Sequence, residues 1–155
     1  PKLNFNVDDM GTMNLSWFEV EEMIDNMILD IVEKEYTIEQ VCGVARGGLI
    51  PGVMISQRLG VPFVPLEWQT RDGKHKDEMK LIQTFRSHSN TLIVDDLIDS
   101  GTTYIGIMNI VNNHCTNSKA LFGTLLNKKE EIALDIVGCN VYNIENWIQF
   151  PWEKT

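Results

Sequence analysis

The chain is short of cysteine, of long apolar runs and of positive charge, and each shortage excludes a class of protein. Three cysteines, with no CxxC pair among them, are too few for a disulfide framework and do not form a structural zinc motif. No apolar run approaches the roughly 20 residues of a membrane span. Lys and Arg number 13 against 22 Asp and Glu, so the net charge is −9. That balance argues against nucleic acid or an anionic membrane as a partner.

The length and amino-acid composition are typical of one globular domain. The chain has 155 residues, of which 43% are hydrophobic and 23% charged. A chain of this size buries about 70% of its extended surface when it folds. Neither a repeat nor a linker divides it, and its first five residues lack a charged-then-apolar export segment. We expect a single domain over residues 1–155, in the cytoplasm.

The hydrophobic pattern alternates between strands and helices. Ser16 and Glu19 form a capping box ahead of apolar residues spaced three and four apart, which predicts an amphipathic helix. Strands are predicted at 41–45, 61–66, 91–94, 120–126 and 137–144, and further helices at 49–59 and 104–111. This alternation is typical of an α/β fold with a mostly parallel sheet flanked by helices. Ligands of such sheets bind at the carboxyl ends of the strands.

Residues 68–80 form the most polar stretch. We interpret it as a long exposed loop or hairpin, and long loops in compact domains often act as lids over a site. The plainer alternative is a solvated connection.

The strongest chemical signal is the segment 92–103, in which an apolar strand runs into a polar turn. The N–H groups and hydroxyls of a turn that opens a helix suit a phosphate, and here they belong to Ser100, Gly101, Thr102 and Thr103. Carboxylates at the strand end suit sugar hydroxyls or Mg²⁺, and Asp95 and Asp96 stand there. Asp99 stands at the edge of the same turn, where its carboxyl group could accept or donate a proton. Helix capping alone would not require this many aspartates and hydroxyls.

Segment 92–103 resembles the signature that binds phosphoribosyl pyrophosphate in type I phosphoribosyltransferases. The resemblance implies that the turn 100–103 holds the 5′-phosphate and that Asp95 and Asp96 hold the ribose. It also implies Mg²⁺ bound by Asp96 and Asp95, directly or through water, and Asp99 as the catalytic group facing purine N7. We found neither a GxxxxGK[ST] loop nor a GxGxxG turn after a strand, the common competing phosphate motifs.

Three further places resemble the purine members of this family, the xanthine–guanine enzymes. Residues 44–52 are similar to the pyrophosphate loop, which implies pyrophosphate binding by Arg46 and Gly47 and a cis peptide bond between Ala45 and Arg46. The alternative for that loop is a tight turn with a surface arginine. Residues 147–153 are similar to the base-binding segment and imply base contacts from Trp147, Ile148 and Glu153. Lys128 matches the lysine that contacts the purine 6-oxygen, with Lys129 as the competing candidate.

The resemblance as a whole, over residues 38–155, implies a purine phosphoribosyltransferase. Its core would span about 15–135, with a small hood formed by about 136–155 and the N-terminal segment. A 6-oxopurine and phosphoribosyl pyrophosphate would give a nucleoside 5′-monophosphate and pyrophosphate, with Mg²⁺ as cofactor. A homodimer or homotetramer is implied, with no nucleic-acid or membrane partner. Another base, or a non-catalytic nucleotide-binding regulator, stays open, and Gln149, where an acidic residue is common, leaves the preferred 6-oxopurine undetermined.

Overall fold

A five-stranded parallel sheet forms the centre of the computed structural model, in the order β4-β3-β7-β8-β9. The structure describes residues 5–68, 70–71, 74–75, 78–87, 90–115 and 119–153. The strands are β3 (Gln40–Ala45), β4 (Phe63–Glu67), β7 (Asn90–Ile98), β8 (Lys119–Asn127) and β9 (Ile136–Asn140). β4 is an edge strand, which suits its internal Pro65 because a proline cannot donate to the ladder.

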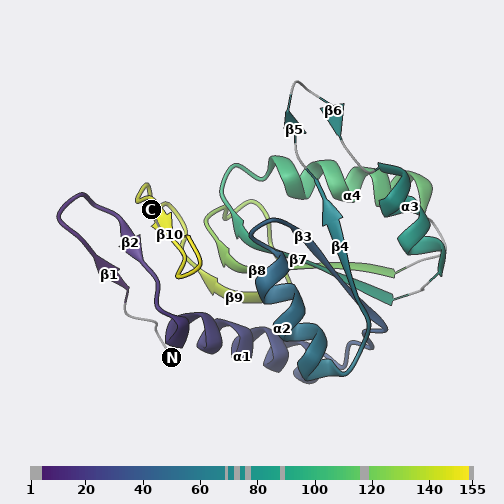
Figure 1. Ribbon diagram of the computed structural model, residues 1–155, viewed down its shortest axis with the longest axis horizontal. Coiled ribbons are helices and arrows are strands. Elements are labelled where there is room, and N and C mark those ends of the chain that lie inside the picture. The colour runs from purple at the N-terminus through teal and green to yellow at the C-terminus, as the bar shows by residue number, and fades with distance from the viewer. Residues whose placement is uncertain are drawn as a thin grey trace.

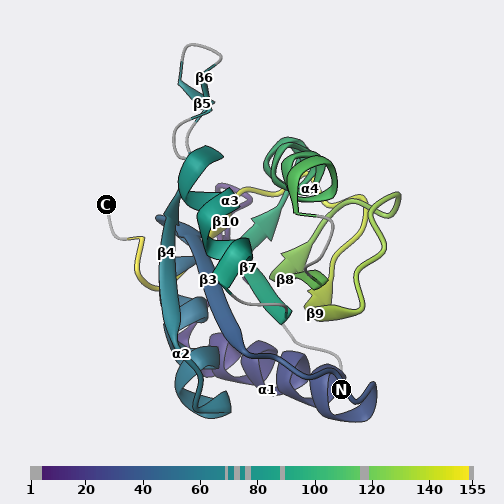
Figure 2. The same ribbon diagram turned by 90° about the vertical axis from the view of Figure 1, so that its right-hand side faces the viewer.

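Helices cover both faces of this sheet, as the alternating pattern predicted (Figure 2). α1 (Trp17–Glu33) and α2 (Leu49–Leu59) pack on one face, and α3 (Glu78–Ser87) and α4 (Thr102–His114) pack on the other. The interior divides accordingly into two apolar clusters. Successive residues of β7 alternate between them, with Leu92 and Val94 in the α1 cluster and Ile93 in the α4 cluster. None of the helices within the described residues is long and apolar enough to cross a membrane.

Local sequence signals account for the helix ends. Ser16 Oγ accepts from the Glu19 N–H at 3.2 Å, and the Glu19 carboxylate accepts from the Ser16 N–H at 3.0 Å, so the predicted capping box is confirmed. α2 ends at Gly60, whose φ of 66° is the left-handed conformation that glycine adopts without strain.

The stretch 68–80 is where the predicted loop differs most from the structure. Trp68 is 4% exposed and belongs to the α4 cluster, so the expectation that it lies in an exposed loop is wrong. The strands β5 (Thr70–Arg71) and β6 (Lys74–His75) pair as an antiparallel hairpin, while 69, 72–73 and 76–77 lie outside the described residues. α3 was not predicted. Leu81 and Phe85, four residues apart, lie on one face of this helix and are buried in the α4 cluster.

A second, three-stranded sheet joins the two ends of the chain (Figure 1). β2 (Met13–Asn14) pairs antiparallel with β1 (Asn6–Val7) and parallel with β10 (Ile148–Gln149). β9 belongs to the main sheet, so this smaller sheet takes its C-terminal strand from residues beyond β9 rather than from about residue 136. We call the β1–β2 hairpin together with residues 141–153 the hood.

Candidate active site

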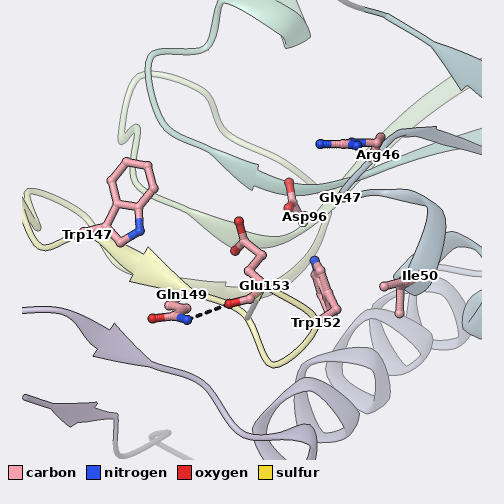
Figure 3. A pocket seen from close by; sticks show the side chains of 8 residues that line it. All are labelled: Arg46, Gly47, Ile50, Asp96, Trp147, Gln149, Trp152 and Glu153. Atoms are coloured by element: carbon pink, nitrogen blue, oxygen red, sulfur yellow. Dashed lines mark hydrogen bonds between the residues drawn. The ribbon is translucent and has the colours of Figure 1, made fainter. Parts of the chain in front are cut away.

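The larger of two cavities at the carboxyl ends of the strands lies between the main sheet and the hood, with a volume of about 770 Å³. Its lining comes from three distant parts of the sequence: Arg46, Gly47 and Ile50; Asp96; and Trp147, Gln149, Trp152 and Glu153. Figure 3 shows Trp147 on one side and Arg46 on the other, with the carboxylates of Asp96 and Glu153 between them. The fold therefore brings together the predicted pyrophosphate loop and the predicted base segment.

The turn after β3 lies directly against the aspartates of β7. The peptide bond between Ala45 and Arg46 is cis, as the resemblance implied. A methyl group on Gly47 would lie 1.9 Å from Asp96 Oδ2, and one on Gly48 would lie 2.5 Å from the Val94 carbonyl oxygen. Gly48 is therefore required where the loop passes the backbone of β7, and Gly47 leaves room for the Asp96 carboxylate.

Asp95 and Asp96 face different cavities. We expected the strand to end before them, but β7 continues to Ile98 because β8 pairs alongside it, with Asp95 opposite Thr124 and Ile98 opposite Asn127. Neighbouring side chains of a strand point to opposite faces. Asp96 accordingly lines the larger cavity and Asp95 lines the smaller one.

The two aspartates carry an unfavourable concentration of negative charge. Burial raises the pKa of Asp95 well above its usual range, and the neighbouring Asp96 charge raises it further. Burial also raises the pKa of Asp96, with a further contribution from the Glu153 carboxylate. The Asp96 N–H donates to Asp95 Oδ1 at 2.8 Å, which partly offsets the cost. A cation in this position would relieve the crowding.

The smaller cavity, of about 120 Å³, is lined almost entirely by one continuous stretch, Asp95 and residues 97–104. α4 begins at Thr102 directly after Gly101, whose φ is 87°. Ser100 Oγ lies 3.0 Å from Thr102 Oγ1 and accepts from the Thr102 N–H at 3.3 Å. Thr102 and Thr103 thus form the first turn of a helix whose N–H groups open onto the cavity, an arrangement that favours an anion.

Lys128 contacts residues beside both cavities, although it is not among the residues that line either one. Its backbone N–H donates to the Ile98 carbonyl at 2.9 Å, which places it opposite the 99–101 turn. Its ammonium donates to the Asn146 carbonyl at 3.0 Å and lies 3.6 Å from Asp99 Oδ1. Asp99 lines the smaller cavity, and Asn146 immediately precedes Trp147 in the larger one. The competing candidate, Lys129, instead donates its backbone N–H to the Asn127 side chain.

The predicted base segment divides between the cavity and the core. Trp147 is 71% exposed at the cavity wall, whereas Ile148 is 4% exposed and belongs to the α1 cluster. Ile148 is not among the residues that line the cavity, and its contact with the base stays a prediction. Glu153 is held by its own segment, because Glu153 Oε1 accepts from the Phe150 N–H at 3.0 Å.

The lining includes residues to which the sequence analysis gave no binding role. Trp152 stacks on Phe150 with ring centroids 4.7 Å apart, and its other neighbour is Trp17 of α1 at 5.7 Å. Gln149 Nε2 donates to the Glu153 carbonyl at 2.6 Å. The close spacing of Trp147, Phe150 and Trp152 in the sequence could have indicated an aromatic wall of the cavity. The residues around Ile50 in the sequence gave no indication that it lines the cavity.

The acidic residues fit Mg²⁺ only in combination with a substrate. Within the part of the chain that the structure describes, no group of three or more His, Cys, Asp or Glu side chains could hold a metal ion. Mg²⁺ is commonly bound by one or two carboxylates plus phosphate oxygens and water. Asp96, beside the Arg46 loop and with a raised pKa, supplies such a carboxylate, and Asp95 is its neighbour in the other cavity.

Comparisons with known proteins identify the family of this chain. The model of the phosphoribosyl transferase domain family matches residues 14–154. The xanthine-guanine phosphoribosyltransferase of Chromohalobacter salexigens is 27% identical over 142 residues, which covers 90% of this chain and 82% of that protein. The counterpart from Desulfotalea psychrophila is 22% identical over 149 residues, covering 92% and 86%.

Solved structures show the same fold. The purine phosphoribosyltransferase of Pyrococcus horikoshii superposes with a TM-score of 0.69 at 28% identity, covering 93% of this chain and 95% of that chain. The xanthine-guanine-hypoxanthine phosphoribosyltransferase of Helicobacter pylori has a TM-score of 0.71 at 16% identity, covering 92% and 93%. Since the family model spans nearly the whole chain, this protein belongs to the phosphoribosyl transferase domain family.

Proposed function

We propose that this protein transfers the phosphoribosyl group of phosphoribosyl pyrophosphate to a 6-oxopurine, giving a nucleoside 5′-monophosphate and pyrophosphate. The observation that carries the proposal is the position of Lys128 and Asp99. The Lys128 ammonium lies 3.6 Å from Asp99, which lines the cavity beside a helix N-terminus suited to a phosphate. The same ammonium donates to the carbonyl of Asn146, the residue before Trp147 of the aromatic-walled cavity suited to a base. Xanthine-guanine phosphoribosyltransferases are among the relatives, which supports the same class of base.

The 5′-phosphate would bind at the turn 100–103, where the N–H groups of the first turn of α4 and the Ser100 and Thr102 hydroxyls face the smaller cavity. Binding energy gained at this remote group orients the sugar C1 toward the base. Asp95 and Asp96 would accept hydrogen bonds from the ribose hydroxyls.

Pyrophosphate would leave toward Arg46 and Gly47, at the opposite side of the larger cavity from Trp147. The Arg46 guanidinium and the N–H groups of the turn stabilise negative charge as it develops on the leaving group. Asp96, with Asp95, would hold Mg²⁺. When bound, the ion neutralises charge on the pyrophosphate.

The base would stack on Trp147, whose side chain is open to the cavity. An aromatic stack of this kind contributes about 1–3 kcal/mol. The Lys128 ammonium has donors and no acceptor, so it favours a 6-oxo group over a 6-amino group. Asp99 would accept a hydrogen bond or the proton from purine N7 while N9 attacks C1.

Glu153 would face the exocyclic groups at the far edge of the base, and the β5–β6 hairpin would close over the site.

The test is pyrophosphate release from phosphoribosyl pyrophosphate and Mg²⁺ with hypoxanthine, guanine, xanthine, adenine, uracil and orotate in turn. Turnover confined to the 6-oxopurines is the expected result. Turnover with adenine or a pyrimidine would contradict the role of Lys128 and leave the phosphoribosyl site standing. The folded protein releasing no pyrophosphate with any base would reject the enzymatic proposal.

We also propose that the protein acts in the cytoplasm as a homodimer or homotetramer. Trp17 and Phe18, both exposed at the start of α1, are candidates for the contact between copies. Light scattering during size-exclusion chromatography decides between these states, and a monomer at micromolar concentration would contradict both.

A further inference from the structure

The Lys128 ammonium is nearly enclosed by protein, with its side chain 10% exposed. A buried ammonium is costly unless acceptors surround it, so those acceptors determine where its donors point. One N–H reaches the Asn146 carbonyl, and the Asp99 carboxylate lies beside the group. Since an ammonium has three N–H groups, at least one is left within the described residues for an oxygen of a ligand.

Asn146 is itself fastened to the opposite end of the sequence. Its Nδ2 donates to the Gly11 carbonyl at 2.7 Å, across 135 positions of the chain. Gly11, with φ 79°, lies in the turn between β1 and β2. Asp8 closes that turn by accepting from the Met10 and Thr12 N–H groups, each at 2.9 Å. The anchor of Asn146 is therefore a well-formed hairpin.

The same hairpin continues along the base segment. The Met13 N–H donates to the Trp147 carbonyl at 2.8 Å, and the Leu15 N–H donates to the Gln149 carbonyl at 2.9 Å. Residues 146–149 are thus held by the N-terminal strand on one side and by Lys128 at their start. Asn146 lies in the connection between β9 and β10. Its carbonyl accepts from Lys128, and its side-chain amide bonds to the β1–β2 hairpin.

We infer that Asn146 is a positioning residue for purine binding: by tying the hood loop to the β1–β2 hairpin, it holds its own carbonyl where the Lys128 ammonium is aimed at the 6-oxygen of the base. This rests on the proposed function. Asn146 is not among the residues that line either cavity, and its side-chain amide donates to Gly11 rather than to the turn at residues 95–103.

The first experiment measures KM for both substrates in Asn146→Ala and in Asn14→Ala. Asn14 is a matched control, since its amide also bonds within the hairpin, to Asp8 at 3.0 Å, but does not reach Lys128. For Asn146→Ala we expect the purine KM to rise about two- to twelvefold, the size of one lost positioning hydrogen bond. The KM for phosphoribosyl pyrophosphate and kcat should stay within about twofold, because the contact is made equally in ground and transition states. An equal rise in both variants would overturn the inference.

The second experiment asks whether Asn146 acts through Lys128. In a Lys128→Met background, Asn146→Ala should change the purine KM no further, because coupled residues are not additive. Full additivity would overturn the inference. Asn146→Asp, which keeps the shape and removes the N–H donor to Gly11, repeats the test should the alanine variant fold poorly. It should reproduce the rise in purine KM, and a wild-type KM would contradict the role.

A third readout needs no substrate. The rate at which an N-acylating ester modifies Lys128, followed by peptide mass spectrometry, should rise severalfold in Asn146→Ala and stay unchanged in Asn14→Ala. An unchanged rate in Asn146→Ala would overturn the inference. If the wild-type protein transfers phosphoribose to no base, the proposed function fails, and this rate alone still decides whether Asn146 positions the ammonium.

Discussion

The two cavities are built in opposite ways. The smaller one is a single stretch of chain, residues 95–104, that leaves a buried strand and enters a helix. The larger one is assembled from the turn after β3, one residue of β7 and the C-terminal segment, and it depends on the pairing of β10 with β2. A site made from one segment has its geometry set by local backbone conformation. A site made from several has its geometry set by packing, so its function is sensitive to residues that never touch a ligand.

Asp99, which lines the smaller cavity, is expected to show the largest effect. Asp99→Asn removes the carboxylate while keeping the side-chain shape, and kcat should fall about 10²- to 10⁴-fold, the usual range for a general acid or base. The fold should be unaffected, since this side chain is 69% exposed. Steady-state pyrophosphate release measures the effect.

Glu130→Gln is the control for Asp99→Asn, because it also neutralises an exposed carboxylate in the neighbouring loop. Turnover of Asp99→Asn within a few-fold of this control would reject the acid–base role.

Glycine substitutions compare the two turns directly. A methyl group on Gly48 would meet backbone oxygens of Val94 at 2.5 Å and Val44 at 2.7 Å, so two strands would have to move. Gly48→Ala should lower the free energy of unfolding by about 1–3 kcal/mol, the usual cost of overpacking, and should weaken binding of phosphoribosyl pyrophosphate. Urea denaturation and substrate titration measure the two effects.

Gly101→Ala is the counterpart in the single-segment turn. Its new methyl would meet the end of the Ile132 side chain, which can rotate away, so its main cost is the positive φ, about 1–2 kcal/mol. We expect Gly48→Ala to lower the free energy of unfolding more than Gly101→Ala does. The reverse order would contradict the statement that the larger cavity is more closely packed at its turn.

Trp147 separates ligand binding from folding. Because it is 71% exposed, Trp147→Ala should leave the melting temperature nearly unchanged. The purine KM should rise about tenfold, within the range expected for loss of a stacking face. Kinetics and thermal unfolding measured on one preparation check both statements.

Trp152→Ala should differ, because Trp152 stacks on Phe150 and contacts Trp17, so its loss should also lower the melting temperature. Equal melting temperatures for the two variants would contradict this division of roles.

Asp95 gives the smallest expected effect and the one with a pH signature. Burial and the Asp96 charge raise its pKa, so above the ordinary value of 3.8 the unfolded chain has lost a proton that the native state still holds. Native-state stability therefore falls as pH rises from 3.8 through the raised pKa. Asp95→Asn removes this penalty and keeps an oxygen to accept the Asp96 N–H, so it should melt at a higher temperature than wild type at pH 7.

The advantage of Asp95→Asn should disappear below pH 3.8, where wild-type Asp95 is protonated in both states. Thermal unfolding at both pH values in the absence of ligand tests this. A constant difference between the variant and wild type would contradict the proposed origin.

Most elements of the fold could be predicted because their signals are local. The capping box at Ser16, the glycine end of α2 at Gly60 and the apolar run of β7 need only their neighbours in sequence. α3 was missed because its pair of buried residues, Leu81 and Phe85, stands among polar ones and gains meaning only against the sheet. The length of β7 was missed because Asp95 and Asp96 interrupt its apolar run, while pairing with β8 carries the strand past them to Ile98.

The candidate site divides along the same line. The sequence by itself indicated the turn 99–103, because its glycine and hydroxyl groups at fixed spacing favour one local conformation, whereas the Arg46 loop was predicted from a family resemblance. Tertiary structure alone decided that Asp95 and Asp96 face different cavities, that Ile148 belongs to the core, and that Asn146 links Lys128 to Gly11. These relations join residues that are far apart in the chain or depend on which face of a strand is covered, and only packing sets them.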